Sequence, residues 1–250
     1  MDDSPLADWT RPKTTLRRPL LGITILLVED SRYCSEAMRL LSIRSGARLR
    51  RADSIKSARR HLRIYRPDVA LIDLGLPDGS GLEIIQDIAQ GRFAMTSIIA
   101  TSGNINANTY DDAINAGAAF FMEKPVADLA NFQQTILASL PAEMRPRDFV
   151  PRLADSVVKP DAQALKDDLD HIDSLLVDCF EKNDVDILSY AAQFLNSLGR
   201  DANSKRILQV AEKLEDIAKD NNFSCDDVKQ EFRIARKAVD NRLAQSPQIF

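Results

Sequence analysis

The stretch VALIDLGLPDGSG, residues 69–81, combines an apolar strand, a carboxylate at its end and a glycine-rich turn. Its first four residues are continuously apolar, which is typical of a strand that helices cover on both faces of a parallel sheet. Asp73 follows directly. In open α/β sheets, ligands bind at the carboxyl ends of the strands, which is where Asp73 would lie. The stretch therefore indicates both a fold class and the place of a site.

Four other short apolar runs surround this strand, and helical patterns separate them. The runs are ITILLV at 23–28, SIIAT at 97–101 and AFFM at 119–122, together with RLRRA at 48–52, in which the apolar pattern is weak. Apolar residues at helical spacing fall at about 31–45, 55–65, 81–89, 107–116 and 128–140. This alternation predicts an α/β domain over residues 21–140, in which a parallel five-stranded sheet is covered by helices.

Carboxylates follow two of the predicted strands. Glu29 and Asp30 come directly after ITILLV, and Asp73 comes directly after VALI. Because the carboxyl ends of parallel strands meet at one edge of the sheet, we expect the three carboxylates to converge. Like charges at such short range repel, so either one of them holds a proton or a cation neutralises them. Mg²⁺ is a hard cation that prefers oxygen ligands, and it fits this cluster.

A hydroxyl group and an ammonium group come at the ends of the last two strands. Thr101 ends SIIAT, and Lys124 follows AFFM after one residue. Carboxylate, metal ion, hydroxyl and ammonium are the groups needed for an aspartate to attack a phosphoryl group. Asp73 is the candidate nucleophile, and the cations would absorb charge on the transferring oxygens.

The motifs LLVEDS, LIDLGLPDGSG, IIATSG and FFMEKP occur in this order over about residues 20–140. In residues and separations they resemble the receiver domain of two-component response regulators. The resemblance implies a CheY-like, flavodoxin-like (βα)5 fold. It also implies that Mg²⁺ is held by the carboxylates of Glu29, Asp30 and Asp73 and by the carbonyl of Gly75.

The same resemblance implies how the pocket works. Asp73 would accept a phosphoryl group, Thr101 would move to a phosphoryl oxygen and Lys124 would pair with it. The bond between Lys124 and Pro125 is expected to be cis, and Phe121 stands at the position of a switching aromatic ring. The implied phosphoryl donor is a sensor histidine kinase or a histidine-phosphotransfer (HPt) protein. Catalysis by the chain itself would be limited to phosphorylation and dephosphorylation of Asp73.

The remaining segments differ in composition from this domain. Residues 1–20 are expected to form a flexible arm, and the proline-rich residues 141–160 are expected to form a linker. Residues 161–245 show four amphipathic stripes and almost no glycine. Asp161, Asp184 and Ser224 are the expected N-caps between them. Short turns between the stripes predict an all-α four-helix bundle.

Within this helical region, NDVDILSYAAQFLNSLG (183–199) and the Leu214-Glu215 pair resemble an HPt domain. An ungapped alignment places Gln193 where the phosphorylatable histidine of that family stands, and the active residues are replaced. Glutamine has no nucleophilic nitrogen, so it does not carry a phosphoryl group. The polar stripe opposite the apolar one is a candidate interaction face, formed by Ser189, Gln193, Asn196 and Arg200.

Bulk properties exclude several classes of protein. The net charge is −4 and the pI is about 5.3. Residues 150–250 carry 14 lysines and arginines against 19 aspartates and glutamates, so nucleic-acid binding is disfavoured. The three cysteines are far apart and indicate neither a zinc site nor a disulfide framework. No apolar run has the length of a signal peptide or a membrane span, and a cytoplasmic protein is expected.

Four functions remain open at this point. The first is an adaptor in which phosphorylation of Asp73 switches a helical output domain that docks to the receiver, to a second copy or to a partner protein. The second is a relay that passes phosphoryl groups from Asp73 to His171. The third is a transcription factor with a helical DNA-binding output. The fourth, which is compatible with the first, is a dimerisation bundle of the kind found in kinases.

Overall fold

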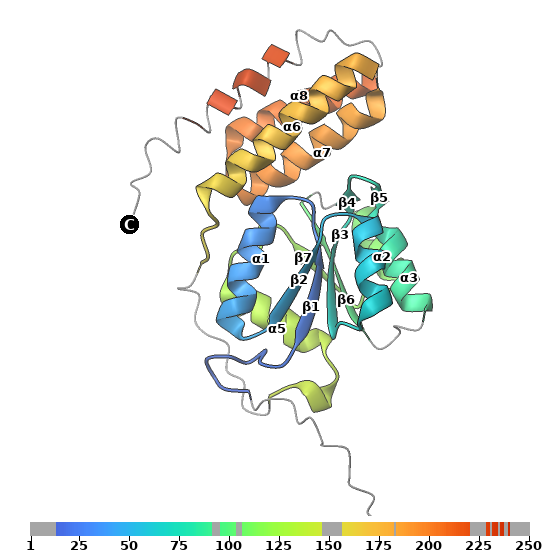
Figure 1. Cartoon of the computed structure of the whole chain (residues 1–250), viewed down its shortest axis with the longest axis vertical. Helices are drawn as coiled ribbons and strands as arrows, with labels where there is room; N and C mark the ends of the chain where they lie inside the picture. Colours follow the sequence, from blue (N-terminus) through green and yellow to red (C-terminus); the bar gives the residue numbers. More distant parts are fainter. Residues whose placement is uncertain are drawn as a thin grey trace, which may run out of the picture.

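The structure is a computed structural model, and it describes residues 14–91, 96–103, 107–146, 157–182, 184–220, 229–230, 232–234, 236–237 and 240. Its first domain alternates strands and helices: β1 (Thr24–Val28), α1 (Arg32–Ser45), β2 (Arg48–Ala52), α2 (Ile55–Ile64), β3 (Val69–Asp73), α3 (Gly81–Gln90), β6 (Ser97–Ser102), α4 (Ala107–Ala116), β7 (Phe120–Glu123) and α5 (Leu129–Ser139) (Figure 1). The five strands pair in parallel in the order β2-β1-β3-β6-β7. The predicted flavodoxin-like fold is confirmed.

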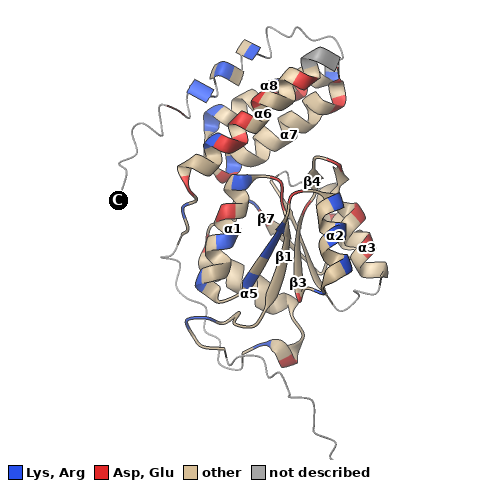
Figure 2. Cartoon of the chain, in the orientation of Figure 1, with Lys and Arg blue, Asp and Glu red and all other residues tan. Residues whose placement is uncertain are grey.

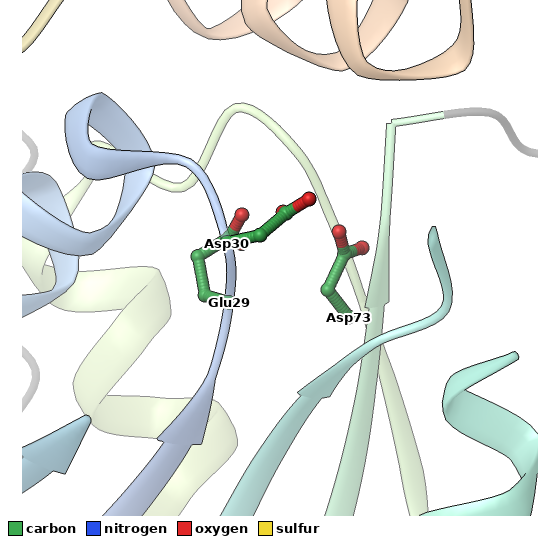
Figure 3. A group of neighbouring side chains, drawn as sticks. All are labelled: Glu29, Asp30 and Asp73. Carbon is green, nitrogen blue, oxygen red and sulfur yellow. The ribbon is translucent and has the colours of Figure 1, made fainter. Parts of the chain in front are cut away.

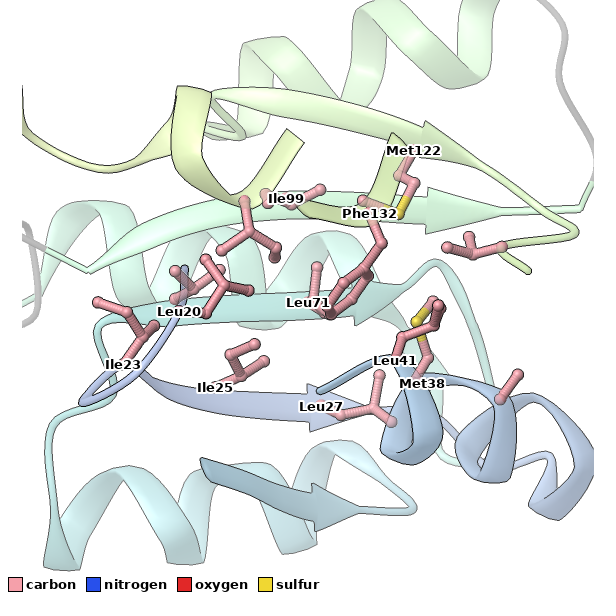
Figure 4. Close-up of a cluster of buried hydrophobic side chains, with 14 of the residues drawn as sticks. Leu20, Ile23, Ile25, Leu27, Met38, Leu41, Leu71, Ile99, Met122 and Phe132 are labelled. Carbon is pink, nitrogen blue, oxygen red and sulfur yellow. The ribbon is translucent and has the colours of Figure 1, made fainter. Parts of the chain in front are cut away.

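Helices cover both faces of this sheet. Successive residues of a strand point to opposite faces, so Leu27 packs with α1 and α5 while Leu26 packs with α2, α3 and α4. Figure 4 shows the first of these cores, in which Met38 and Phe132 meet the sheet. All five residues of β3 are buried, as its continuous apolar pattern predicts for a central strand. The ends of β1 and β3 are thereby held side by side.

A short antiparallel pair after Asp73 was not foreseen from the sequence. Its strands are β4 (Gly75–Leu76) and β5 (Gly79–Ser80), and they close the turn that leads into α3. Two-residue strands carry no periodicity, so the pattern of apolar residues does not reveal them. At the other end of the domain, Leu20 is fully buried in the core and its amide donates to the carbonyl of Ser45. The folded part thus begins before residue 21.

Three helices of the second domain are described: α6 (Ala162–Lys182), α7 (Val185–Asp201) and α8 (Lys205–Asp220). Two of the expected caps are present. The carboxylate of Asp161 accepts from the amide of Gln163 at 2.9 Å, and that of Asp184 accepts from the amide of Asp186 at 3.0 Å. These bonds satisfy first-turn amides that lack a partner within the helix. The third expected cap, Ser224, lies outside the described residues.

The helical domain has a core of its own, formed by the apolar stripes of α6, α7 and α8. Phe232 is buried in this core, and Arg236 forms ion pairs with Asp170 and Asp173 of α6. The described residues between 229 and 240 are helical. Because most of residues 221–250 lie outside the described part, the fourth helix of the predicted bundle stays a prediction.

The helical domain lies over the carboxyl ends of the strands, above α1 and the β4–β5 pair (Figure 1). The chain that leads into it is fastened to the first domain: Val157 pairs with Asp128, and the amide of Val158 donates to the carbonyl of Ala127. Val158 is buried in the core beside α5. The end of the predicted linker is therefore part of the packed structure.

Charged side chains are unevenly distributed over the chain. In Figure 2, acidic residues mark the ends of β1 and β3 beneath the helical domain, whereas basic residues lie on β2 and α2 at the edge of the sheet. None of the helices that the structure describes is long and apolar enough to cross a membrane.

Candidate functional site

Three carboxylates meet where β1 and β3 end. Ligand oxygens of Glu29, Asp30 and Asp73 all lie within 4.8 Å of one another (Figure 3). The strands bring them together because Val28 is in register with Ile72, so the residues that follow them become neighbours. The convergence predicted from the sequence is present in the structure.

Lys124 supplies the positive charge of this cluster. It is 1% exposed, and its Nζ lies 2.7 Å from Oε2 of Glu29 and 3.1 Å from Oδ2 of Asp73. Burial by itself would lower the lysine pKa, but Asp73 and other nearby acids raise it well above its ordinary value. The ammonium group is therefore charged and counters two buried carboxylates. As expected, the peptide bond from Lys124 to Pro125 is cis.

Burial also changes the carboxyl groups. It raises the pKa of Asp73 from 3.8 to about 7, against the attraction of Lys124 and with the help of the repulsion from Glu29. The pKa of Asp30 is raised well above 3.8 by burial and by the charges of Glu29 and Asp73. The cluster thus holds more negative charge than one lysine neutralises, and it favours either a proton or a further cation.

The chemistry of the donor set fits one particular kind of cation. All three side chains offer carboxylate oxygens, which hard divalent ions such as Mg²⁺ prefer. Mg²⁺ usually binds through one or two carboxylates and keeps several waters, so it needs open space beside them. A cavity of about 190 Å³ adjoins the cluster and is lined by these three residues and Gly75. Glu29, Asp30, Asp73 and Gly75 are therefore the residues that would hold Mg²⁺.

The other predicted residues lie at the neighbouring strand ends. Thr101 is fully buried on β6, in register with Asp73, and its hydroxyl has no hydrogen-bond partner among the described residues. Such an unpaired hydroxyl is costly unless a further group bonds to it. Phe121 is half-buried on β7, and its ring centre lies 5.7 Å from that of Tyr110. A switch by rotation of the Phe121 ring stays a prediction.

Side chains of α7 complete the cavity from the opposite domain. Tyr190 donates a hydrogen bond from its hydroxyl to Oδ2 of Asp30. Nζ of Lys124 donates to the hydroxyl of Ser197 at 3.3 Å. Phe194 lines the cavity between these two contacts. The helical domain thus contacts the same groups that form the carboxylate cluster.

The candidate interaction face of α7 only partly coincides with these contacts. Gln193 and Asn196 line the cavity, whereas Ser189 and Arg200 are not among its lining residues. The side chain of Arg200 donates to Asn196 instead, at 3.1 Å. The α7 residues Tyr190, Phe194 and Ser197, which contact the receiver or line the cavity, each lie one position after a residue of the candidate face. The sequence did not reveal this because Phe194 belongs to the apolar stripe and is shared between the domain core and the interface.

A second contact fastens α6 to the start of α1. The carboxylate of Asp168 accepts from the hydroxyl of Ser31 at 2.8 Å and from the amides of Arg32 at 2.8 Å and Tyr33 at 3.0 Å. These amides belong to the first turn of α1, which has no partners for them within the helix. Asp167 adds an ion pair with Arg32 at 2.9 Å. No sequence pattern marked Asp168, because it lies in an ordinary acidic helix.

Two glycines of the turn after Asp73, Gly75 and Gly81, differ in the space that a side chain would find. A Cβ on Gly81 would lie 2.0 Å from the carbonyl oxygen of Asp73, whereas a Cβ on Gly75 would meet no atom within 4 Å. We expect Gly81→Ala to lower the free energy of unfolding by about 3 kcal/mol, because the backbone that carries Asp73 has to move. Gly75→Ala is the matched control, with an expected change within about 0.5 kcal/mol.

Urea unfolding of both glycine variants checks this prediction. Equal stability of Gly81→Ala and Gly75→Ala would show that the turn adapts and does not fix Asp73 through close packing.

Neither histidine lies at the cavity that contains Asp73. His171 is exposed on α6, with its ring centre 5.9 Å from that of Phe194, and burial of part of the ring lowers its pKa. His61 is on α2 and stacks edge-on against Tyr65. Cys34 and Cys179 are buried and form no disulfide among the described residues, and Cys225 lies outside the described residues.

Comparison with known proteins covers the first domain. Residues 25–136 match the family described as "Response regulator receiver domain". The regulatory protein KdpE of Escherichia coli is 30% identical over 101 residues, which are 40% of this chain and 44% of KdpE. PilR of Pseudomonas aeruginosa is 33% identical over 115 residues, 46% of this chain and 25% of PilR. The chain spans less than half the length of the curated relatives it matches here.

Solved structures align with the same part of the chain. The receiver domain of the sensor histidine kinase PA1611 from Pseudomonas aeruginosa, which has a magnesium ion in its active-site cleft, is 24% identical. The alignment covers 47% of this chain and 96% of that one, with a TM-score of 0.44. A CheY-like receiver domain from Methanospirillum hungatei is 23% identical, and the alignment covers 46% and 90% of the two chains with a TM-score of 0.43.

Proposed function

Because residues 25–136 form a response regulator receiver domain, we propose that this chain accepts a phosphoryl group on Asp73 and signals through its helical domain. The observation that carries the proposal is the cluster of Glu29, Asp30 and Asp73 around the buried ammonium group of Lys124. Carboxylates at such short range repel one another, and a bound cation would relieve this repulsion and also stabilise a phosphoryl group during transfer to Asp73.

The side chains around Asp73 have separate tasks in this reaction. An oxygen of the Asp73 carboxylate attacks phosphorus, the bond from phosphorus to the donor breaks, and the leaving group takes the electron pair. Lys124 is already 3.1 Å from Asp73 and stabilises the charge on the transferred oxygens. The unpaired hydroxyl of Thr101 gains a partner when it donates to a phosphoryl oxygen. Bound Mg²⁺ would supply further positive charge at the transferring group.

The donor and the output follow from the same family. Receiver domains interact with histidine kinases or phosphotransfer proteins, so a sensor histidine kinase or an HPt protein is the proposed donor. The proposed output is protein interaction by the helical domain, as an adaptor, supported by its contacts with Asp30 and Lys124 and by its net negative charge. A cytoplasmic location is part of the proposal.

The proposed function is tested by phosphorylating the chain with a small phosphoryl donor, with and without metal. Wild-type protein is incubated with phosphoramidate in Mg²⁺ or in EDTA, and its intact mass is measured. We expect one added phosphoryl group with Mg²⁺ and a rate at least about 100-fold lower in EDTA, because several kcal/mol of charge stabilisation is lost. Equal phosphorylation in EDTA would contradict a role for the carboxylate cluster as a metal site.

A DNA-binding output is the second candidate, because matched relatives such as KdpE and CitB of Klebsiella pneumoniae are called transcriptional regulatory proteins. Their matched segments cover 40% and 42% of this chain. The acidic helical domain argues against DNA as its partner. Salt-dependent binding of the full chain to duplex DNA at micromolar concentration would favour this candidate.

Transfer of a phosphoryl group from Asp73 to His171 has no support from geometry, since His171 does not line the cavity at Asp73.

A further inference from the structure

We propose that α7 is a built-in lid which competes with the phosphoryl donor and with Mg²⁺ for the Asp73 pocket. The docked helical domain and the phosphorylated receiver would then exclude one another. This inference rests on the proposed function and adds the regulation of the same site. Four observations carry it.

The first observation is a single stripe on α7 that faces the receiver. Tyr190, Phe194, Ser197 and Asp201 are separated by four, three and four residues, so they share one side of the helix. Two of these four residues contact groups that the reaction needs. Tyr190 bonds to Asp30, and Ser197 accepts a hydrogen bond from Lys124.

The second observation concerns the oxygens of Asp30. Oδ1 accepts from the amide of Ser31 at 2.9 Å, and Oδ2 accepts from the hydroxyl of Tyr190. The hydroxyl of Tyr190 is the donor of this second bond. A metal ion coordinated by Asp30 competes with this bond for the same oxygen. Metal binding and the Tyr190 contact therefore oppose each other.

The third observation is the lack of room above Asp73. The side chain of Asp73 is largely buried, and the cavity beside it measures about 190 Å³. A Cβ placed on Gly103 would lie only 3.1 Å from Cα of Ser197, which shows how closely α7 approaches this loop. Phosphoramidate fits a cavity of this size, whereas a helix of a donor protein does not. A protein donor has to displace α7 to reach Asp73.

The fourth observation is an acidic side chain of α7, Asp201, which lines a neighbouring cavity together with Lys124. Oδ2 of Asp201 is buried and has no hydrogen-bond partner among the described residues. Burial raises the pKa of Asp201 to about 7, while Lys124 attracts its charged form and Glu29 repels it. A phosphoryl group on Asp73 adds about two negative charges and takes over Lys124. The attraction between Lys124 and Asp201 is then weakened, and this favours release of α7 from the receiver.

The contact of Asp168 with α1 provides a readout of this opening. The amides of Arg32 and Tyr33 are protected by Asp168 across the interface, whereas the amide of Ser35 donates to the carbonyl of Ser31 within the receiver. Opening of the lid exposes the first two amides to solvent and leaves the third in place. Ser35 is thus an internal control for unfolding of α1.

The experiment is hydrogen exchange of the full chain, resolved by residue with NMR, without ligand and with Mg²⁺ and beryllofluoride. We expect the amides of Arg32 and Tyr33 to exchange at least about tenfold faster in the beryllofluoride complex, with Ser35 unchanged. If beryllofluoride binds and these two amides keep their protection, the lid proposal is wrong although the receiver works.

A variant pair gives the reciprocal test. Ser197→Arg places a bulky cation against Lys124 and should open the lid, whereas Gln209→Arg adds the same group on the exposed side of α8. Since coupling between two binding events is reciprocal, Ser197→Arg should bind Mg²⁺ and beryllofluoride at least about tenfold more tightly than Gln209→Arg. Equal affinities would overturn the lid. Absence of binding and of phosphorylation in both variants and in the wild type would reject the proposed function, and the lid proposal with it.

Discussion

Phosphorylation is expected to disappear completely when Asp73 is replaced with Asn. The amide of asparagine has no nucleophilic oxygen of comparable strength, and its replacement also removes one of the three expected metal ligands. Asp73→Asn should take up no phosphoryl group from phosphoramidate and Mg²⁺ under conditions that modify the wild type fully. Intact-protein mass spectrometry measures this directly.

Two controls separate loss of the acceptor from general damage. Asp78 lies in the same loop as Asp73, and its carboxylate accepts hydrogen bonds from the amides of Ile55 and Lys56 at the start of α2. Asp78→Asn should leave the extent of phosphorylation unchanged. Asp30→Asn keeps the acceptor but weakens the metal site, so it should slow phosphorylation without abolishing it. Continued phosphorylation of Asp73→Asn at a wild-type rate would move the acceptor to another residue.

Lys124→Met is expected to destabilise the chain by about 3 to 5 kcal/mol at pH 8 in the absence of metal. The ammonium group is buried between Glu29 and Asp73, and its loss leaves two buried carboxylates without their counter-charge. Lys219→Met is the matched control, because this lysine is exposed and lies 3.8 Å from Glu215. An exposed pair of this kind contributes at most about 1 kcal/mol. Urea unfolding measures both changes.

Lys124→Met should lower the free energy of unfolding less at pH 5 than at pH 8. Burial raises the pKa of Asp73 from 3.8 to about 7, so the folded chain binds this proton more tightly than the unfolded chain does. The resulting stabilisation is present below pH 4 and is lost as the pH rises through 7. At pH 5 a protonated Asp73 needs no ammonium partner. A decrease in the free energy of unfolding that is equal at both pH values, or no larger than the decrease caused by Lys219→Met, would show that charge does not hold the cluster together.

The receiver pocket could be predicted from the sequence because parallel strands bring their ends together. Once VALI was identified as a buried strand, Asp73 had to lie beside the residues that follow the neighbouring strand, and Glu29 and Asp30 do so. Lys124 could be placed in the same way. The β4–β5 pair could not, because two-residue strands have no periodic pattern.

The docking of the helical domain was beyond what the sequence indicates. An amphipathic pattern shows which side of α7 is apolar. Phe194 belongs both to the core of the helical domain and to the lining of the cavity, so the side of α7 that contacts the receiver lies at the edge of its apolar side. The role of Asp168 depends on a contact between residues 137 positions apart in the chain. Such contacts follow from how two folded surfaces meet, which periodicity does not encode.

Phosphorylation of Asp73 is tested most directly by locating the phosphoryl group on the wild-type chain. After treatment with phosphoramidate and Mg²⁺, borohydride reduces an aspartyl phosphate to homoserine, and peptide mass spectrometry identifies the converted residue. We expect conversion at position 73 alone. Conversion at another aspartate, or a phosphoryl group carried by His61 or His171, would contradict it.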